Sequence, residues 1–179
     1  TDKLFTKKYE EETNLRCQIV IDASSSMYFP EPDKKATGLH VNKLIFSTIC
    51  ASAIIHLLKL QRDAAGLTIF TDDLLVHTKS GSSNVHHKLL QTQLESFIGK
   101  SSRDVKTDAG KCLHLIAENI HRRSLVLIFS DMFEDTTKAD ELFSALQHLK
   151  HNKHEVVVFH VTDKKHELDF AYDNRPYVF

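Results

Sequence analysis

The sequence is poor in cysteine, and its three cysteines, Cys17, Cys50 and Cys112, form no Cys-x-x-Cys pair. Such a set supplies neither a disulfide framework nor a typical structural zinc site. We therefore expect buried free thiols in a reducing compartment. No signal peptide is visible, which favours a cytoplasmic protein.

The sequence also lacks an excess of either charge, because its formal net charge is −1. No broad basic field is present, so nucleic acid and anionic membranes are poor candidates as partners. Its most apolar stretch, residues 44–60, is interrupted by polar side chains and is expected to be a buried helix rather than a membrane span.

Strand-like and helix-like segments alternate along the 179 residues. We expect helices at 42–60, near 84–98, at about 108–121 and at 138–150, and strands at 16–21, 64–70, 74–78, 125–129 and 155–161, the last two both buried. This alternation predicts a Rossmann-like three-layer α/β/α sandwich whose mainly parallel sheet has one antiparallel edge strand. Residues 1–179 are read as one domain, expected to be a fragment of a longer chain, with a lead-in at 1–14 and an edge strand or tail at 166–179.

The most informative feature is the sequence Asp22-Ala23-Ser24-Ser25-Ser26, which directly follows an apolar strand. A second apolar run ends in Ser130-Asp131. Because the carboxyl ends of parallel strands meet at one edge of a sheet, Asp22 and Asp131 should lie side by side there. Carboxylate and hydroxyl oxygens suit hard divalent cations such as Mg²⁺. Thr107, between the two in sequence, stands where it could cap the third helix or point into the crevice.

Asp22-x-Ser24-x-Ser26, then Thr107, then Asp131, is similar to the metal-ion-dependent adhesion site of von Willebrand factor A domains. The flanking segments 9–16, 66–70, 125–131 and 154–161 narrow the resemblance to the bacterial family called domain of unknown function 58. Members of that family are typically encoded beside MoxR-type AAA+ ATPases.

This resemblance implies a site for Mg²⁺, or for Mn²⁺ or Ca²⁺. Ser24 and Ser26 would touch the ion, Thr107 would bind directly or through water, and Asp22 and Asp131 would carry the negative charge. An acidic residue of a protein partner would complete the coordination, and the partner would be a MoxR-type ATPase. The sequence departs from the family at Asp104-Val105-Lys106, where glycines often stand, and Lys106 adds a positive charge near the expected ion.

Three other interpretations stay open. The serines could simply cap the first helical turn or form a turn, or the domain could be structural with a vestigial, metal-free site. A Mg²⁺-dependent phosphotransferase also has a strand ending in aspartate, but Ser24 stands where that chemistry needs a second carboxylate, and Lys106 is the only lysine expected nearby.

Histidines are frequent, and some are spaced like metal ligands. His148, His151 and His154 follow one another at intervals of three, but the end of a polar helix is a more ordinary place for them. His86 and His87 are expected at the surface.

Overall fold

The computed structural model describes residues 14–31, 41–98, 108–132 and 138–171. Among the predictions, Thr107, the segment 104–106, most of the lead-in and the end of the tail lie outside the described residues. The architecture described below concerns only the described ranges.

The sheet has five strands in the order β3-β2-β1-β4-β5. The central strand β1 (Arg16–Asp22) is parallel to β2 (Ala64–Phe70) on one side and to β4 (Leu125–Ser130) on the other. Next to β4 lies β5 (Glu155–His160), also parallel, whereas β3 (Leu74–Gly81) runs antiparallel to β2. The predicted parallel sheet with one antiparallel edge strand is confirmed.

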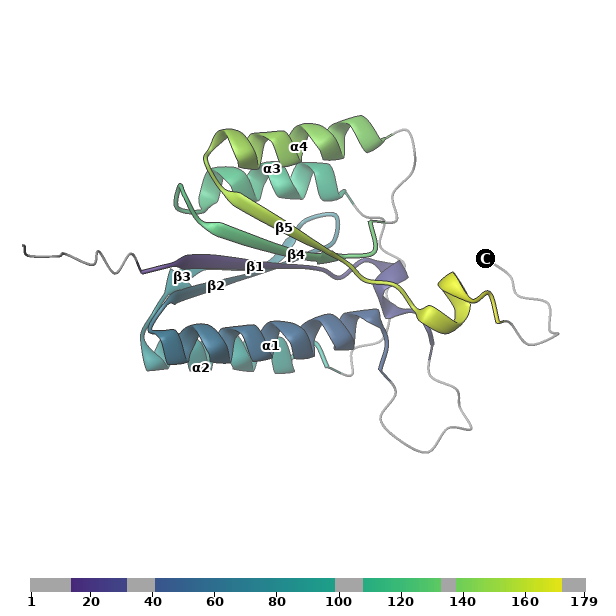
Figure 1. The fold of residues 1–179 in the computed structure, drawn as a ribbon, viewed down its shortest axis with the longest axis horizontal. Helices are drawn as coiled ribbons and strands as arrows, with labels where there is room; N and C mark the ends of the chain where they lie inside the picture. Colours follow the sequence, from purple (N-terminus) through teal and green to yellow (C-terminus); the bar gives the residue numbers. More distant parts are fainter. Residues whose placement is uncertain (1–13, 32–40, 99–107, 133–137, 172–179) are drawn as a thin grey trace, which may run out of the picture.

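Helices cover both faces of this sheet (Figure 1). One layer contains α1 (Lys43–Gln61) and α2 (Asn84–Glu95), and the other contains α3 (Ala109–Asn119) and α4 (Ala139–His151). A separate apolar core lies under each layer, so the three-layer prediction is confirmed. Two short turns flank the carboxyl edge of the sheet: η1 (Ser25–Tyr28) after β1, and η3 (Lys164–Leu168) after β5.

Side-chain caps fix the starts of three helices. Asn42 Oδ1 accepts the Ile45 N–H at the start of α1, and Ser83 Oγ accepts the His86 N–H at the start of α2. At the start of α3 the cap is Asp108, whose Oδ1 accepts the Lys111 N–H. Of the two alternatives for Thr107, the one in which it caps this helix is therefore wrong, because Asp108 occupies the capping position.

The long helix α1 is apolar over most of its circumference. By length and composition alone it could cross a membrane, but here its buried face packs against β1 and β2 as one side of a core. Phe46, Ile49 and Leu57 on its other side are about half exposed.

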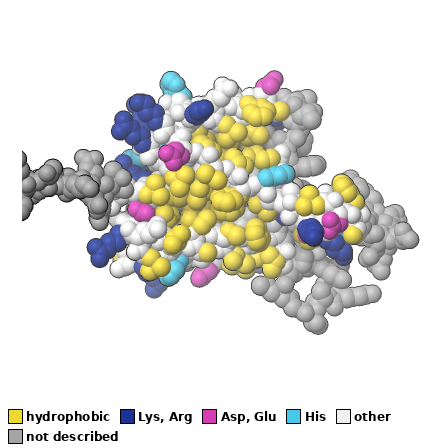
Figure 2. Space-filling view, in the orientation of Figure 1, with side chains coloured by type: hydrophobic (Ala, Val, Ile, Leu, Met, Phe, Trp, Pro, Cys, Tyr) yellow, Lys and Arg dark blue, Asp and Glu magenta, His cyan; other side chains and the backbone are white. Residues whose placement is uncertain are grey.

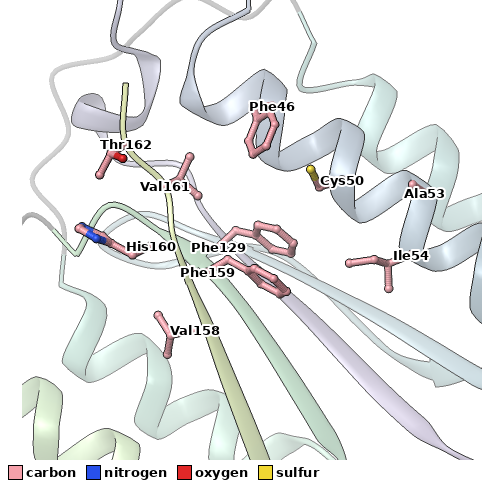
Figure 3. A pocket seen from close by; sticks show the side chains of 10 residues that line it. All are labelled: Phe46, Cys50, Ala53, Ile54, Phe129, Val158, Phe159, His160, Val161 and Thr162. Carbon is pink, nitrogen blue, oxygen red and sulfur yellow. The ribbon is translucent and has the colours of Figure 1, made fainter. Parts of the chain in front are cut away.

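The prediction of a buried strand at 155–161 is wrong for most of that segment. Val157, Val158 and Phe159 are each about 40% exposed, because among the described residues β5 is an edge strand and no further strand pairs with its outer side. Hydrophobic side chains gather over this part of the surface (Figure 2). They line a hollow of about 680 Å³ between β5 and α1 that includes Phe46, Cys50, Ile54 and the stacked rings of Phe129 and Phe159 (Figure 3). Cys17 and Cys112 are buried as expected, whereas Cys50 is only partly buried at this hollow.

Two histidines were placed wrongly from the sequence. His87, expected at the surface, is only 2% exposed because it lies on the face of α2 that packs on α1. His154, expected at a solvated helix end, is 5% exposed and its Nδ1 accepts the backbone N–H of Ser124. His151 is exposed as expected, and His148 shares a 3.0 Å hydrogen bond with His114.

Gly66 in β2 is a position where a side chain cannot fit. A Cβ added there would lie 2.8 Å from the carbonyl oxygen of Thr78 in β3, and it would collide with the buried Gln18 side chain, which hydrogen-bonds to Thr68 and Thr78. We expect Gly66→Ala to lower the free energy of unfolding by about 2 kcal/mol, as for other overpacked interiors, when measured by urea denaturation.

Gly110→Ala is the matched control, because the added Cβ would meet mainly the flexible, exposed side chain of Glu141. Alanine also favours the helical backbone of α3 relative to glycine. An equal decrease in the free energy of unfolding in the two variants would contradict the explanation that Gly66 is needed for packing.

Candidate functional site

Two carboxylates lie at the carboxyl edge of the sheet, on its two central strands. Asp22 ends β1 and Asp131 directly follows β4, and the parallel register pairs Ile21 with Phe129. Asp22 is 3% exposed and Asp131 is 8% exposed. The sequence-based expectation that these strand ends meet agrees with this geometry, because Ser130 Oγ donates a 2.7 Å hydrogen bond to Asp22 Oδ2.

Both oxygens of Asp22 accept hydrogen bonds from the protein. The backbone N–H of Ser24 donates to Oδ1 at 2.8 Å, and Ser130 donates to Oδ2. Burial raises the pKa of Asp22 above its usual value, and the nearby Asp131 charge acts in the same direction, although these hydrogen bonds partly offset the rise. Asp22 is thus a buried acid whose ionised form is disfavoured.

The hydroxyls of Ser24 and Ser26 face one another, with their Oγ atoms 3.1 Å apart. Ser24 precedes η1, but its side chain makes no capping hydrogen bond to that turn. Of the alternative that the serines cap a helix or form a turn, the cap is therefore wrong for Ser24, whereas the turn is present as η1. Instead, the two hydroxyls form a small group of oxygens beside Asp22.

A lysine that sequence reasoning missed lies at the centre of this edge. The Lys43 ammonium donates to Asp131 Oδ2 at 2.8 Å and to Glu167 Oε1 at 2.6 Å. Its side chain is 3% exposed, against 5% for Asp131 and 32% for Glu167. The ammonium also lies 5.8 Å from the centre of the Phe29 ring. One signal was available in the sequence: lysine in the first turn of a helix faces the positive end of the helix dipole, which is an unfavourable place for a cation.

Glu167 reaches Lys43 from the turn η3, which follows β5. Its other oxygen, Oε2, accepts the backbone N–H of Asp163, and Asp163 in turn caps the turn by accepting the His166 N–H. The His166 ring packs edge-on against Phe29, with centroids 5.4 Å apart. The predicted tail thus contains an ordered turn whose glutamate completes the site.

The structure brings four of the five predicted site residues to one edge: Asp22, Ser24, Ser26 and Asp131. The fifth, Thr107, lies outside the described residues. Among the described residues, no three His, Cys, Asp or Glu side chains are grouped so that they could hold a metal ion.

The described residues do not fit a divalent cation in this arrangement. The buried Lys43 ammonium already contacts Asp131, and an added ion there would meet a like charge at short range in a poorly solvated place. The Mg²⁺ ligand set read from the sequence stays a prediction.

Comparisons with known proteins agree with this architecture. The family model described as "Protein of unknown function DUF58" matches residues 1–169. BatB, a conserved hypothetical protein from Bacteroides thetaiotaomicron, is similar with a TM-score of 0.58 and 18% identity over 81% of this chain. An aerotolerance-related membrane protein from Bacteroides fragilis NCTC 9343 gives a TM-score of 0.55 and 19% identity over 83% of this chain.

This chain spans 65% of the BatB chain and 68% of the Bacteroides fragilis chain. The von Willebrand factor A domain of SpRpn10 also matches, with a TM-score of 0.41 and 15% identity over 82% of this chain and 88% of that one. At these identities the likeness concerns the fold alone. The comparison with curated proteins gives no match.

Proposed function

This chain belongs to the DUF58 family of proteins of unknown function and has a von Willebrand factor A-like fold, and on that premise we propose that it is a protein-binding module. Its carboxyl edge binds an acidic side chain of a partner protein. Ligands of open α/β sheets bind in the crevice beyond the carboxyl ends of the strands. The observation that carries the proposal is the buried Asp22, Asp131 and Lys43 group at that edge, where a cation is already coordinated by carboxylates.

A partly exposed rim surrounds this buried group. Ser26, Met132 and Glu167 are each partly exposed, and the exposed His160 donates through Nε2 to the carbonyl oxygen of Asp131. A partner's carboxylate entering from this rim would accept charge-assisted hydrogen bonds from the cation of the site, and such bonds are shorter and stronger than neutral ones. Binding of this kind needs no nucleophile and no turnover.

The partner to test first is a MoxR-type AAA+ ATPase, because the sequence resemblance implies such a neighbour. Binding of this ATPase to the immobilised chain should weaken at least tenfold, about 1.4 kcal/mol, in Asp22→Ala. That variant removes the acceptor that holds the Ser24 backbone and the Ser130 hydroxyl in place. Measurement by biolayer interferometry with Mg²⁺ and with EDTA would also show whether an ion takes part.

Glu155→Ala is the control for that experiment, since Glu155 is exposed at the opposite edge of the sheet, where β5 begins. Circular dichroism of both variants establishes that they are folded. If a folded Asp22→Ala binds the ATPase as well as the wild type does, this edge of the sheet is not the interface.

One observation favours a second candidate, a Mg²⁺-dependent phosphotransferase. The expectation that Lys106 was the only nearby lysine is wrong, because Lys43 contacts Asp131. However, Ser24 still stands where an acid/base carboxylate would be needed, and both oxygens of Asp22 accept hydrogen bonds. Turnover of an aryl phosphate with Mg²⁺ that is lost in Asp22→Asn would replace the binding proposal.

A further inference from the structure

We infer that the Lys43 ammonium, rather than a divalent ion, is the cation of this site, and that Glu167 is a resident carboxylate holding the place of a partner's acidic side chain. This inference deepens the proposed function and rests on it for the identity of the incoming group. The identification of the Lys43 ammonium as the cation, called the ammonium centre below, depends only on the contacts of Lys43.

The position of Lys43 is explained by the carboxylates around it and not by its helix. The first turn of α1 disfavours a cation, and a lysine that is 3% exposed has lost nearly all its hydration. Its Nζ nevertheless lies 2.8 Å from Asp131 and 2.6 Å from Glu167. Buried lysines are retained where opposite charges and hydrogen bonds compensate for lost water. The ammonium therefore occupies the place where a metal ion would have to meet Asp131.

Glu167 closes the more accessible side of the ammonium. It is the more exposed of the two carboxylates, at 32% against 5% for Asp131. None of the residues of its turn, 164–168, is buried. The turn reaches the sheet edge through the Glu167–Lys43 pair and the edge-on packing of His166 against Phe29. Glu167 is therefore the carboxylate that can be exchanged, because it is partly exposed and its turn contains no buried residue, whereas the Asp131 side chain is buried.

Replacement of Glu167 by a partner's carboxylate conserves the interactions of the ammonium. One N⁺–H···O⁻ hydrogen bond breaks as an equivalent one forms, and Asp131 stays in place throughout. Because one carboxylate replaces another, the exchange itself contributes little binding free energy. The free energy of binding must therefore come from the partner's contacts around the rim. The site therefore selects a carboxylate presented by a protein surface over a free carboxylic acid.

Chemical rescue tests the ammonium centre without any partner protein. Glu167→Ala removes the resident carboxylate from a partly exposed position, so the chain should remain folded but melt earlier. Sodium acetate should then raise Tm by about 2–4 °C in this variant at concentrations well above its Kd. Sodium chloride of equal ionic strength should not raise the Tm of this variant, and acetate should not raise the Tm of the wild type more than sodium chloride does.

Asp73→Ala is the matched control, because it removes a carboxylate from the exposed Lys111–Asp73 pair, whose side chains are 52% and 72% exposed. Acetate should not stabilise this variant, since an exposed ammonium in water gains little from one ion pair. The absence of an acetate effect in Glu167→Ala, or an equal effect in Asp73→Ala, would overturn the inference.

Calorimetric titration of the chelator-treated wild type with MnCl₂ and MgCl₂ decides between the two cations. We expect no saturable binding that depends on Asp22. Saturable binding that disappears in Asp22→Ala would overturn the inference while leaving a metal-dependent form of the proposed function intact. Conversely, acetate rescue together with failure to bind the ATPase would reject that partner and keep the ammonium centre.

Discussion

Lys43→Met should lower the free energy of unfolding by about 3–5 kcal/mol, the range found when one partner of a buried ion pair is removed. Methionine nearly reproduces the length of the lysine side chain, so packing along the stem changes little. The loss comes from the buried Asp131 side chain, which would no longer have the ammonium 2.8 Å away. Urea denaturation followed by far-UV circular dichroism measures the difference.

The exposed Lys111–Asp73 pair supplies the control. Lys111→Met makes the same chemical change at a pair of identical 2.8 Å length whose side chains are mostly exposed. Exposed pairs contribute little because water screens both charges, so the loss of stability there should be small. If the two methionine variants lose the same stability, Lys43 is not an essential counter-charge.

A double variant separates the charge from the rest of the lysine. In Lys43→Met/Asp131→Asn the unpaired carboxylate is gone, so much of the loss seen in Lys43→Met should be recovered. A double variant as unstable as the sum of its single variants would mean that the two side chains do not interact energetically. That result would also remove the basis for an ammonium-centred site.

The fold could be predicted from the sequence because the strong signals were local. The runs 64–70 and 125–129 carry β-type apolar residues, and the four helices carry either an apolar face or a cap such as Ser83. The alternation of these elements then leaves few arrangements other than a parallel sheet. The burial of β5 was predicted wrongly. An apolar run such as Val156 to Phe159 can form a central strand or an edge strand, so its composition does not show which position it takes.

The candidate site could be predicted only in part, for a related reason. Asp22 and Asp131 were found because strand ends converge at one edge of the sheet. Lys43 and Glu167 are separated by 124 positions and meet only in the folded chain, so no spacing rule connects them. Serine and aspartate at strand ends suggested a metal ion because such oxygen ligands commonly bind one. The unfavourable position of Lys43 in the first turn of its helix was the one local signal that the cation could be a side chain.

Acidification should destabilise the folded chain, because three buried or partly buried histidines resist protonation. Burial lowers the pKa of His77, His87 and His154 below the usual 6.5. A group with a depressed folded pKa stabilises the fold above its unfolded pKa, and that stability is lost as the pH falls through the folded pKa. Each histidine contributes at most about 1.4 kcal/mol per pH unit. We therefore expect the free energy of unfolding to fall between pH 7 and pH 5, when measured by urea denaturation at each pH.

Asp22 acts in the opposite sense, because its pKa is raised by burial. Stability contributed by such an acid is present below its unfolded pKa and is lost as the pH rises through its folded pKa. The stabilisation by Asp22 is therefore complete only below its ordinary pKa of 3.8, whereas that by the histidines is complete only above their ordinary pKa of 6.5. A stability curve that rises steadily from pH 7 to pH 5 would contradict the histidine argument.

His87→Leu isolates one of the three contributions. Neither ring nitrogen of His87 has a hydrogen-bond partner among the described residues, and the side chain is buried between α2 and α1. Leucine should therefore raise the free energy of unfolding by about 1–2 kcal/mol at pH 7.5, and the difference should widen below pH 6.5 as the wild-type unfolded state gains a proton that leucine cannot take. His151→Leu, at an exposed position of α4, should change stability by less than about 0.5 kcal/mol. Equal pH profiles for wild type and His87→Leu would show that His87 titrates alike in the folded and unfolded chains.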